Sequence, residues 1–473
     1  MAFSRFKNPL AAAPHIKQLP DKEVKRRYPW FRWRVMEATF LGYATFYLIR
    51  SNNLSVVAKD VQDSLNYSKS DIGLLMAITA ATYGIGKFFM GAWSDRSDAR
   101  KFMSLGLLLT ALCNFAFGAA GDFKVHLMLW ALNGLVQGMG WPPCGRSMGH
   151  WFSERERGLT FSIWNTSHNV GGGVAGYIAA WAVISFGGWQ YAFYVPGAIA
   201  LIGALYLFIR LIDTPQSVGL PPIEVYNNDT PAQVKDGDSP ERELSFKELF
   251  VDYVLLNKFV WLLAFANFFA YVSRYSMLDW GPTYLREIKG VGITKGSLAV
   301  VITELAGVPS TILLGWLSDR LGGRRGMVST LCMIPVFGAF VAILVTPKGM
   351  LWLDFVMLGV IGFFIYPVIN LIVVQSLDLT SKKAIGTVAG FIGLVGYAGK
   401  VIESWVFGWM QDHFTNLYNK EIAWNIIIGA ILGCTFLAGV LLAFTWTLRP
   451  PRKEDFQEPK EGEEMALAGK PSK

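Results

Sequence analysis

Twelve long apolar stretches, each near the length of a membrane-spanning helix, occupy most of this 473-residue chain. A helix crosses the hydrocarbon core of a bilayer with about 20 residues. The predicted spans are 34–56, 72–93, 102–119, 126–150, 159–186, 189–211, 257–284, 296–317, 326–345, 350–376, 384–412 and 424–447. Backbone polar groups in lipid must be paired within each helix. The sequence therefore predicts an all-α polytopic membrane protein.

Composition supports this class and argues against others. Hydrophobic residues make up 52% of the chain and charged residues only 16%, which disfavours a soluble protein. The net charge of +8 does not indicate nucleic-acid binding, because the basic residues collect at the amino terminus and in short loops between spans. The four cysteines lie in apolar stretches without C-x-x-C spacing. We expect no disulfide, metal site, cofactor, catalytic residue or enzymatic activity.

The charged loops predict the topology and the division into domains. Twelve spans put both termini on one side, and the short loops on that side are basic: they carry Arg96, Arg100, Lys101, Arg155, Arg157, Arg320, Arg324, Arg325, Lys382 and Lys383. Both termini should therefore be cytoplasmic. We expect a tail at 1–33, a six-helix bundle at 34–211, a Pro- and acid-rich linker at 212–256, a second bundle at 257–447 and a tail at 448–473.

The two halves of the chain repeat each other. The loop G-A-W-S-D-R beginning at Gly91 returns as G-W-L-S-D-R at Gly315, 224 positions later, and the same offset carries Arg50 onto Arg274. Repeated six-helix halves with a site between them, near the membrane midplane, are typical of secondary transporters. The sequence predicts two pseudo-symmetric bundles with one arginine each at the site.

Arg50 and Arg274 lie within predicted spans, where a charge costs at least about 2.5–3.5 kcal/mol. Two arginines facing one another repel unless an anion lies between them, and the guanidinium fork suits phosphate better than carboxylate. The alternative is a structural role, with each arginine paired to a buried acid such as Glu304 or Asp279, or to backbone carbonyls at a broken helix. Independent packing roles would not explain why both halves carry the arginine at the same place.

Other polar residues within the spans are weaker candidates. Lys87 either faces the cavity or extends to the nearby membrane edge. His168, three residues after Asn165, either contacts the substrate and adds pH dependence or forms an interhelical hydrogen bond. Glu304 is a counter-ion for Arg274 or Lys87, or a carboxylate that takes up a proton.

Lys400 and Glu403 share one helical face. They either neutralise each other or leave Lys400 as a third cation in the cavity. Tyr47 and Tyr271, which lie near the arginines, are candidate cavity residues, and Tyr43, Tyr366 and Tyr397 are weaker ones. The alternative is that these tyrosines belong to the aromatic belts at the membrane interfaces.

The two S-D-R loops suggest conformational latches, because acids and bases at helix ends pair in one state and separate in another. Their charged residues are Asp95, Arg96, Arg100, Asp319, Arg320 and Arg324. The alternative is that these charges only fix the topology.

The loop D-R-S-D-A-R-K after the second span resembles the major facilitator superfamily. The stretches F-L-G-Y-A-T-F-Y-L-I-R, S-I-W-N-T-S-H-N-V-G-G-G and R-Y-S-M-L-D-W-G-P-T-Y-L resemble its organophosphate:phosphate antiporters, above all the glycerol-3-phosphate branch. The resemblance implies that a bacterial inner-membrane protein exchanges an organic phosphate for inorganic phosphate. It implies a phosphate clamp of Arg50 and Arg274 with Lys87 and His168 beside it, working as a monomer in the bilayer.

The chain departs from that family at two positions. Many members have a lysine where this chain has Ser51, and the glycerol-3-phosphate branch has small residues where Lys400 stands. A hexose phosphate is therefore the second candidate substrate. Two other functions remain open: a membrane sensor of sugar phosphate, and proton-coupled uptake through Glu304 or His168.

Overall fold

The computed structural model describes residues 9–228, 251–379 and 385–448, and these are helical without a β-strand. The first half contains α1 (Asp21–Leu48), α2 (Asn52–Leu65), α3 (Lys69–Ser94), α4 (Ala99–Ala119), α5 (Phe123–Gln137), α6 (Trp141–Trp151), α7 (Glu154–Asn165), α8 (Ser167–Phe186), α9 (Tyr191–Arg210), η1 (Pro215–Val218) and α10 (Ile223–Tyr226). The second contains η2 (Val251–Leu255), α12 (Lys258–Asp279), α13 (Gly281–Ile288), α14 (Ile293–Arg320), α15 (Arg325–Val345), α16 (Leu351–Asp378), α17 (Ile385–Leu417) and α18 (Lys420–Ala443).

Each of the twelve predicted spans corresponds to one helix or to two successive helices, which confirms the predicted fold class. Eight helical stretches in the described residues are long and apolar enough to cross a membrane by length and composition alone. The other four spans are broken or carry charged residues: α1 with α2, α5 with α6, α12 with α13, and α17.

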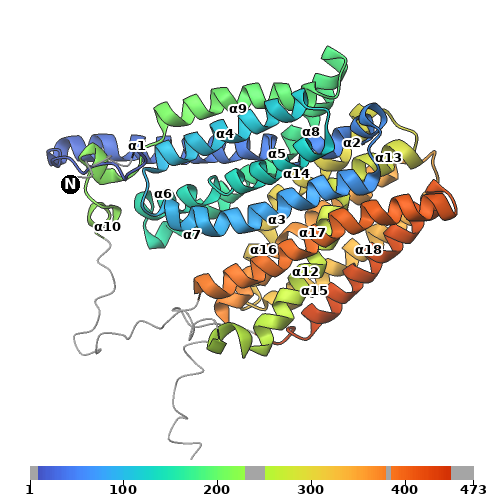
Figure 1. Cartoon of the computed structure of the whole chain (residues 1–473). Coiled ribbons are helices and arrows are strands. Elements are labelled where there is room, and N and C mark those ends of the chain that lie inside the picture. Colours follow the sequence, from blue (N-terminus) through green and yellow to red (C-terminus); the bar gives the residue numbers. More distant parts are fainter. Residues whose placement is uncertain (1–8, 229–250, 380–384, 449–473) are drawn as a thin grey trace, which may run out of the picture.

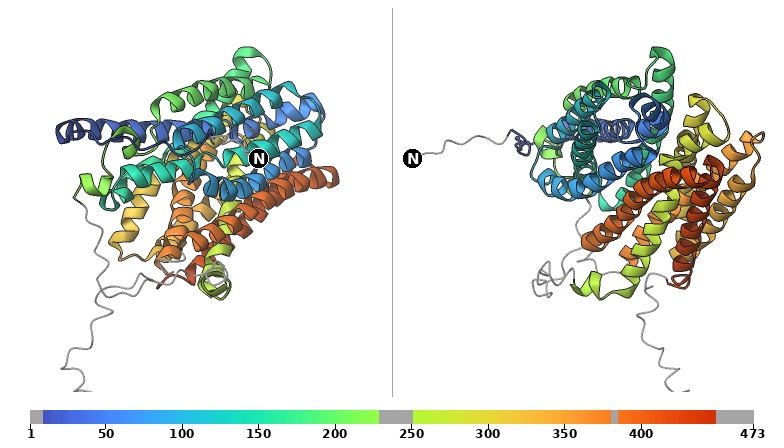
Figure 2. Two further views of the ribbon diagram at one scale, coloured as in Figure 1. Left: turned by 60° about the vertical axis from the view of Figure 1, so that its left-hand side comes forward. Right: turned by 45° about the vertical axis from the view of Figure 1, so that its right-hand side comes forward.

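The helices form two bundles that lie side by side (Figures 1 and 2). Between the bundles, the main contacts are made by α3 with α17 and by α8 with α14. Small residues allow this close approach: a Cβ added at Gly172 of α8 would lie 2.8 Å from Oε1 of Glu304 on α14. Close packing through glycine is common between membrane helices.

The first span is broken at Ile49–Ser51, and Arg50 lies in the break. A break leaves backbone carbonyls without helical partners. Asn114 Nδ2 donates to the carbonyl of Ile49 at 3.0 Å, and Gln137 Nε2 donates to that of Phe46 at 3.0 Å. Amide side chains from α4 and α5 thus stabilise the break that positions Arg50.

The fourth predicted span, 126–150, breaks between α5 and α6, and Pro142 and Pro143 lie in the first turn of α6. Proline is well tolerated there, because the first backbone N–H groups of a helix have no intrahelical acceptor.

The start of the predicted linker at 212–256 is packed against the first bundle. Tyr28 Oη donates to the carbonyl of Pro221 at 3.0 Å, and the Tyr28 ring stacks on Tyr226 with 3.9 Å between centroids. Asp213 accepts hydrogen bonds from Arg146 and from the backbone N–H of Ala99. These contacts hold the segment up to Tyr226 on the bundle, and the bounds of the linker stay a prediction. Residues 229–250 and 449–473 lie outside the described ranges.

Candidate functional site

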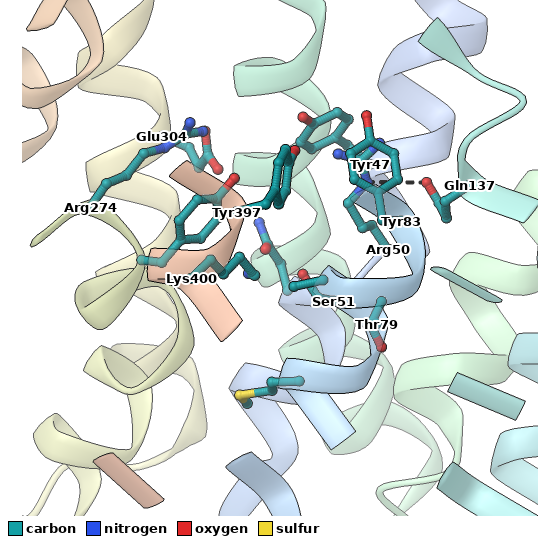
Figure 3. Close-up of a pocket in the computed structure, with 14 residues that line it drawn as sticks. Tyr47, Arg50, Ser51, Thr79, Tyr83, Gln137, Arg274, Glu304, Tyr397 and Lys400 are labelled. Carbon is teal, nitrogen blue, oxygen red and sulfur yellow. Dashed lines mark hydrogen bonds between the residues drawn. The ribbon is translucent and has the colours of Figure 1, made fainter. Parts of the chain in front are cut away.

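A cavity lies between the two bundles, with residues from both halves in its wall (Figure 3). The space between its lining atoms is roughly 470 Å³, part of it open to solvent. Its lining residues are Tyr47, Arg50, Ser51, Asn52, Met76, Thr79, Ala80, Tyr83, Gln137, Arg274, Tyr275, Glu304, Tyr397 and Lys400.

Arg50 is held from the first bundle by one hydrogen bond and two aromatic rings. Its Nε donates to Oε1 of Gln137 at 3.1 Å, and its guanidinium carbon lies 4.0 Å from the Tyr47 ring centroid and 4.2 Å from that of Tyr83. Nη2 is buried and has no hydrogen-bond partner among the described residues. A buried donor without a partner is costly. Arg50 is therefore fixed in place with hydrogen-bonding capacity to spare.

Arg274 lies across the cavity from Arg50 (Figure 3). It is 6% exposed, and its guanidinium carbon lies 4.2 Å from the Tyr366 ring centroid and 4.9 Å from that of Tyr275. Its Nε has no hydrogen-bond partner in the part of the chain that the structure describes. No ion pair there joins it to Glu304 or Asp279. Glu304 still lies close enough to interact electrostatically with Arg274, so its role as a counter-ion stays a prediction.

Lys400 has a partner other than the one its spacing suggested. Its Nζ lies 3.3 Å from Oδ1 of Asp279 on α12 and 3.8 Å from the Tyr275 ring centroid. Within the described residues there is no ion pair between Lys400 and Glu403; Glu403 instead accepts a hydrogen bond from Ser404 at 3.2 Å. Their spacing favoured mutual neutralisation of Lys400 and Glu403, but Lys400 forms its ion pair with Asp279 on the neighbouring helix α12.

Glu304 reaches across the interface between the bundles. Its Oε2 accepts a hydrogen bond from Nδ2 of Asn169, on α8, at 3.0 Å. The side chain is 1% exposed and lines the cavity. The two bundles are therefore joined by a hydrogen bond at the cavity wall.

The remaining predicted residues lie behind the cavity wall or away from it. The His168 ring lies between Tyr47 and Tyr366, with centroid distances of 5.5 and 6.0 Å, and its Nδ1 hydrogen-bonds to the carbonyl of Asn165. Lys87 is not part of the lining; its Nζ lies 4.9 Å from the Trp141 ring centroid.

Two of the predicted tyrosines do not line the cavity but pack against other aromatic side chains. Tyr43 stacks on Trp164 at 5.0 Å between centroids, and Tyr271 packs against Tyr397 at 5.5 Å. Tyr397 itself lines the cavity and contacts Tyr83 of the other bundle at 5.2 Å.

The predicted latch loops make contacts only within their own bundle, as far as the described residues show. Arg325 pairs with Asp319 at 2.8 Å and with Asp378 at 2.6 Å, and Arg100 lies 3.6 Å from Asp98. Arg320 lies over the Trp316 ring. No ion pair to the other bundle is formed by Asp95, Arg96 or Arg324 in this part of the chain. Lys382, Lys383 and the side chains of Arg155 and Arg157 lie outside the described residues.

Sequence reasoning missed several cavity residues, chiefly Gln137, Tyr83 and Tyr275. Gln137 had a signal, because an uncharged polar side chain in the apolar run L-N-G-L-V-Q needs a buried partner. Tyr275 follows Arg274 directly and could have been found from that position.

Two six-helix bundles around a cavity with buried cationic side chains are the architecture of a polytopic membrane transporter. The chain belongs to the major facilitator superfamily, whose sequence profile matches residues 39–403.

Curated relatives cover most of the chain. It is 40% identical to a glycerol-3-phosphate transporter of Bacillus subtilis over 92% of this chain and 96% of that protein. It is 36% identical to a probable hexose phosphate transport protein of Chlamydia trachomatis over 91% of this chain and 95% of that protein. The membrane sensor protein UhpC of Escherichia coli is 36% identical over 85% of this chain and 91% of its own length. The predicted likeness to organophosphate transporters is confirmed.

Solved structures support the fold. A bacterial homolog to the human lysosomal transporter Spinster, in an inward-facing and unoccupied conformation, matches with a TM-score of 0.73 and 17% identity. That match covers 88% of this chain and 96% of the other. The nucleoside transporter NupG matches with a TM-score of 0.65 and 12% identity.

Proposed function

We propose that this protein takes up glycerol-3-phosphate in exchange for inorganic phosphate, by alternating access of one central cavity. The observation that carries the proposal is the pair of buried guanidinium groups, Arg50 and Arg274, in the wall of that cavity, each with a nitrogen that has no hydrogen-bond partner among the described residues. A phosphoryl group offers oxygens to both and compensates both charges. The identity to named glycerol-3-phosphate transporters supports the choice of substrate.

The exchange follows from electrostatics. With the cavity empty, the two like charges repel and disfavour the closing of the bundles over them; a bound phosphoryl group removes that repulsion. Only the loaded carrier then reorients quickly. Inorganic phosphate leaving the cell returns the carrier to the outside, so exchange needs neither a nucleotide nor a cation.

The proposal includes a location and an assembly state. The chain lies in the cytoplasmic membrane of a bacterium with both termini inside, as the basic loops favour. One chain holds the complete cavity, so it works as a monomer.

A hexose phosphate is the second candidate substrate. Lys400 lies in the cavity wall, and its ammonium group can contact additional polar or anionic groups of a larger ester. Relatives named probable hexose phosphate transport proteins match nearly as much of the chain. The relatives named UhpC keep a sensor role as a third candidate.

Reconstitution separates these functions. Purified protein in vesicles loaded with inorganic phosphate should accumulate labelled glycerol-3-phosphate, and unlabelled glucose-6-phosphate should compete more weakly. Vesicles without internal phosphate are the control and should accumulate little. Equal uptake into both kinds of vesicle would refute obligatory exchange, and no uptake of either ester would favour a sensor. Uptake that stops when a pH gradient is collapsed would indicate proton coupling instead.

A further inference from the structure

Two ion pairs and one helix cap join the bundles at the end that lies away from the start of α1 and the end of α18. They involve the end of α2 and the start of α3 in the first bundle, and α13 and the end of α17 in the second; Figure 1 shows α2 and α13 together at that end. From these contacts we propose an outer lock, consisting of Asp60 with Arg286, Lys69 with Glu287, and Asp412 with the start of α3. The lock holds the cavity closed to the outside and must break before substrate enters. It rests on the alternating access of the proposed function.

Arg286 and Asp60 form the two-pronged part of the lock. Nη1 and Nη2 of Arg286 donate to the two carboxylate oxygens of Asp60 at 2.5 and 2.9 Å. Parallel hydrogen bonds of this kind are among the strongest side-chain pairs and fix orientation as well as distance. The pair therefore holds α13 on α2 in one geometry.

Lys69 and Glu287 form the buried part. Nζ of Lys69 lies 2.7 Å from Oε2 of Glu287, and the two side chains are only 9% and 3% exposed. Trp424 Nε1 donates to the same carboxylate oxygen at 3.0 Å. When a buried pair loses one member, the other charge remains buried and uncompensated. Removal of one member should therefore disfavour the closed end, because opening returns the remaining charge to water.

Asp412 completes the lock from α17. Its two carboxylate oxygens accept hydrogen bonds from the backbone N–H groups of Lys69 and Ser70, at 3.2 and 2.7 Å. These donors have no helical acceptor at the start of α3, where the helix dipole also favours a negative charge. A Cβ added at Gly408, one turn earlier on α17, would lie 2.4 Å from the carbonyl of Lys69. The two helices therefore touch at their backbones here.

Most of the side-chain hydrogen bonds between the bundles in the described ranges lie at the lock. The remaining side-chain hydrogen bonds between the bundles include Arg286 Nη1 to the carbonyl of Val56 at 3.4 Å, at the same end, and Asn169 to Glu304 at 3.0 Å, at the cavity. Among the described residues of the charged loops, Arg325 pairs with Asp319 and Asp378 and Arg100 pairs with Asp98, each within its own bundle. α13 is also fixed to its own bundle, since Lys289 pairs with Asp354 at 3.1 Å. Separation of the bundles at the far end must therefore break the lock.

The test measures access to the cavity without requiring transport. A cysteine at position 80 in the cavity wall, introduced as Ala80→Cys into the full chain, reports labelling by a membrane-impermeant thiol reagent added to intact bacterial cells. We expect Asp60→Asn and Glu287→Gln each to raise the labelling rate by on the order of tenfold or more. The matched control is Asp63→Asn, which removes an ion pair within α2, Lys59 with Asp63 at 2.8 Å, and should leave the rate unchanged.

Exchanging the two charges tests whether misfolding, and not loss of the ion pair, raises the labelling rate. The double variant Asp60→Arg with Arg286→Asp should return the labelling rate toward that of the parent. Unchanged rates in Asp60→Asn and Glu287→Gln, or an equal rise in Asp63→Asn, would overturn the lock. Failure of phosphate exchange in reconstituted vesicles would instead overturn the proposed function, because the labelling experiment needs no substrate.

Discussion

Replacing Gln137 by glutamate puts a carboxylate on the arginine that we expect to bind phosphate. In the structure, the amide oxygen of Gln137 accepts a hydrogen bond from Arg50 Nε at 3.1 Å. Gln137→Glu has nearly the same shape, so Arg50 should stay in place. What changes is its charge balance, because the guanidinium acquires a counter-ion from the protein. An incoming phosphoryl group should therefore bind to Arg50 with a less favourable free energy.

The size of the effect follows from these contacts. A hydrogen bond to a charged group contributes about 1.5–3 kcal/mol, and two unit charges about 4 Å apart near a protein surface attract by about 4 kcal/mol. These figures bound the loss of phosphate binding at about 1.5–4 kcal/mol. Because about 1.4 kcal/mol corresponds to tenfold, half-saturation by inorganic phosphate should rise between about tenfold and about 1,000-fold.

The assay is phosphate counterflow in vesicles containing purified protein, measured over a range of phosphate concentrations. Gln375→Glu is the matched control, because it also buries a new carboxylate but lies at Thr445, away from the cavity. Among correctly folded molecules, Gln375→Glu should leave half-saturation by inorganic phosphate unchanged. Half-saturation as in the parent for Gln137→Glu would refute the assignment of Arg50 to phosphate.

Three further predictions concern stability, each measured as the melting temperature of the purified protein. Lys400→Ala leaves Asp279 buried without its cation and should lower the free energy of unfolding by about 3–5 kcal/mol, and with it the melting temperature. The double variant Lys400→Ala with Asp279→Ala should recover part of that loss. Burial and the neighbouring Asp213 raise the pKa of Asp98, in the loop before α4; its charge therefore costs stability above that pKa, so Asp98→Asn should raise the melting temperature at pH 7, and the gain should vanish toward about pH 4. Tyr226→Ala removes the stack on Tyr28 and should cost at least about 0.5–1.5 kcal/mol; an unchanged melting temperature in any of the three would contradict the corresponding contact.

The helices and the pair of arginines were predictable for physical reasons. The length of an apolar stretch fixes whether a helix can cross a bilayer, and the repeat placed Arg50 and Arg274 in corresponding helices. Their positions in the cavity wall agree with that reasoning. That they bind phosphate stays a prediction.

The break at Arg50 and the partner of Lys400 were not predictable, because both depend on contacts between helices distant in sequence. No proline or glycine marks the break; amides of Asn114 and Gln137 stabilise it from other helices. Spacing along one helix pointed Lys400 to Glu403, but Asp279 lies closer in space. The charges of the outer lock likewise look like ordinary loop charges until the fold pairs them.

The central claim is that one phosphate occupies both guanidinium groups, and direct binding tests it. Labelled inorganic phosphate should bind the purified protein with one site per chain. Arg50→Lys and Arg274→Lys should each lose most of that affinity, because lysine lacks the two-pronged fork, and the double variant should be little worse than either single one. Two sites per chain, or losses that simply add in the double variant, would contradict a shared phosphate.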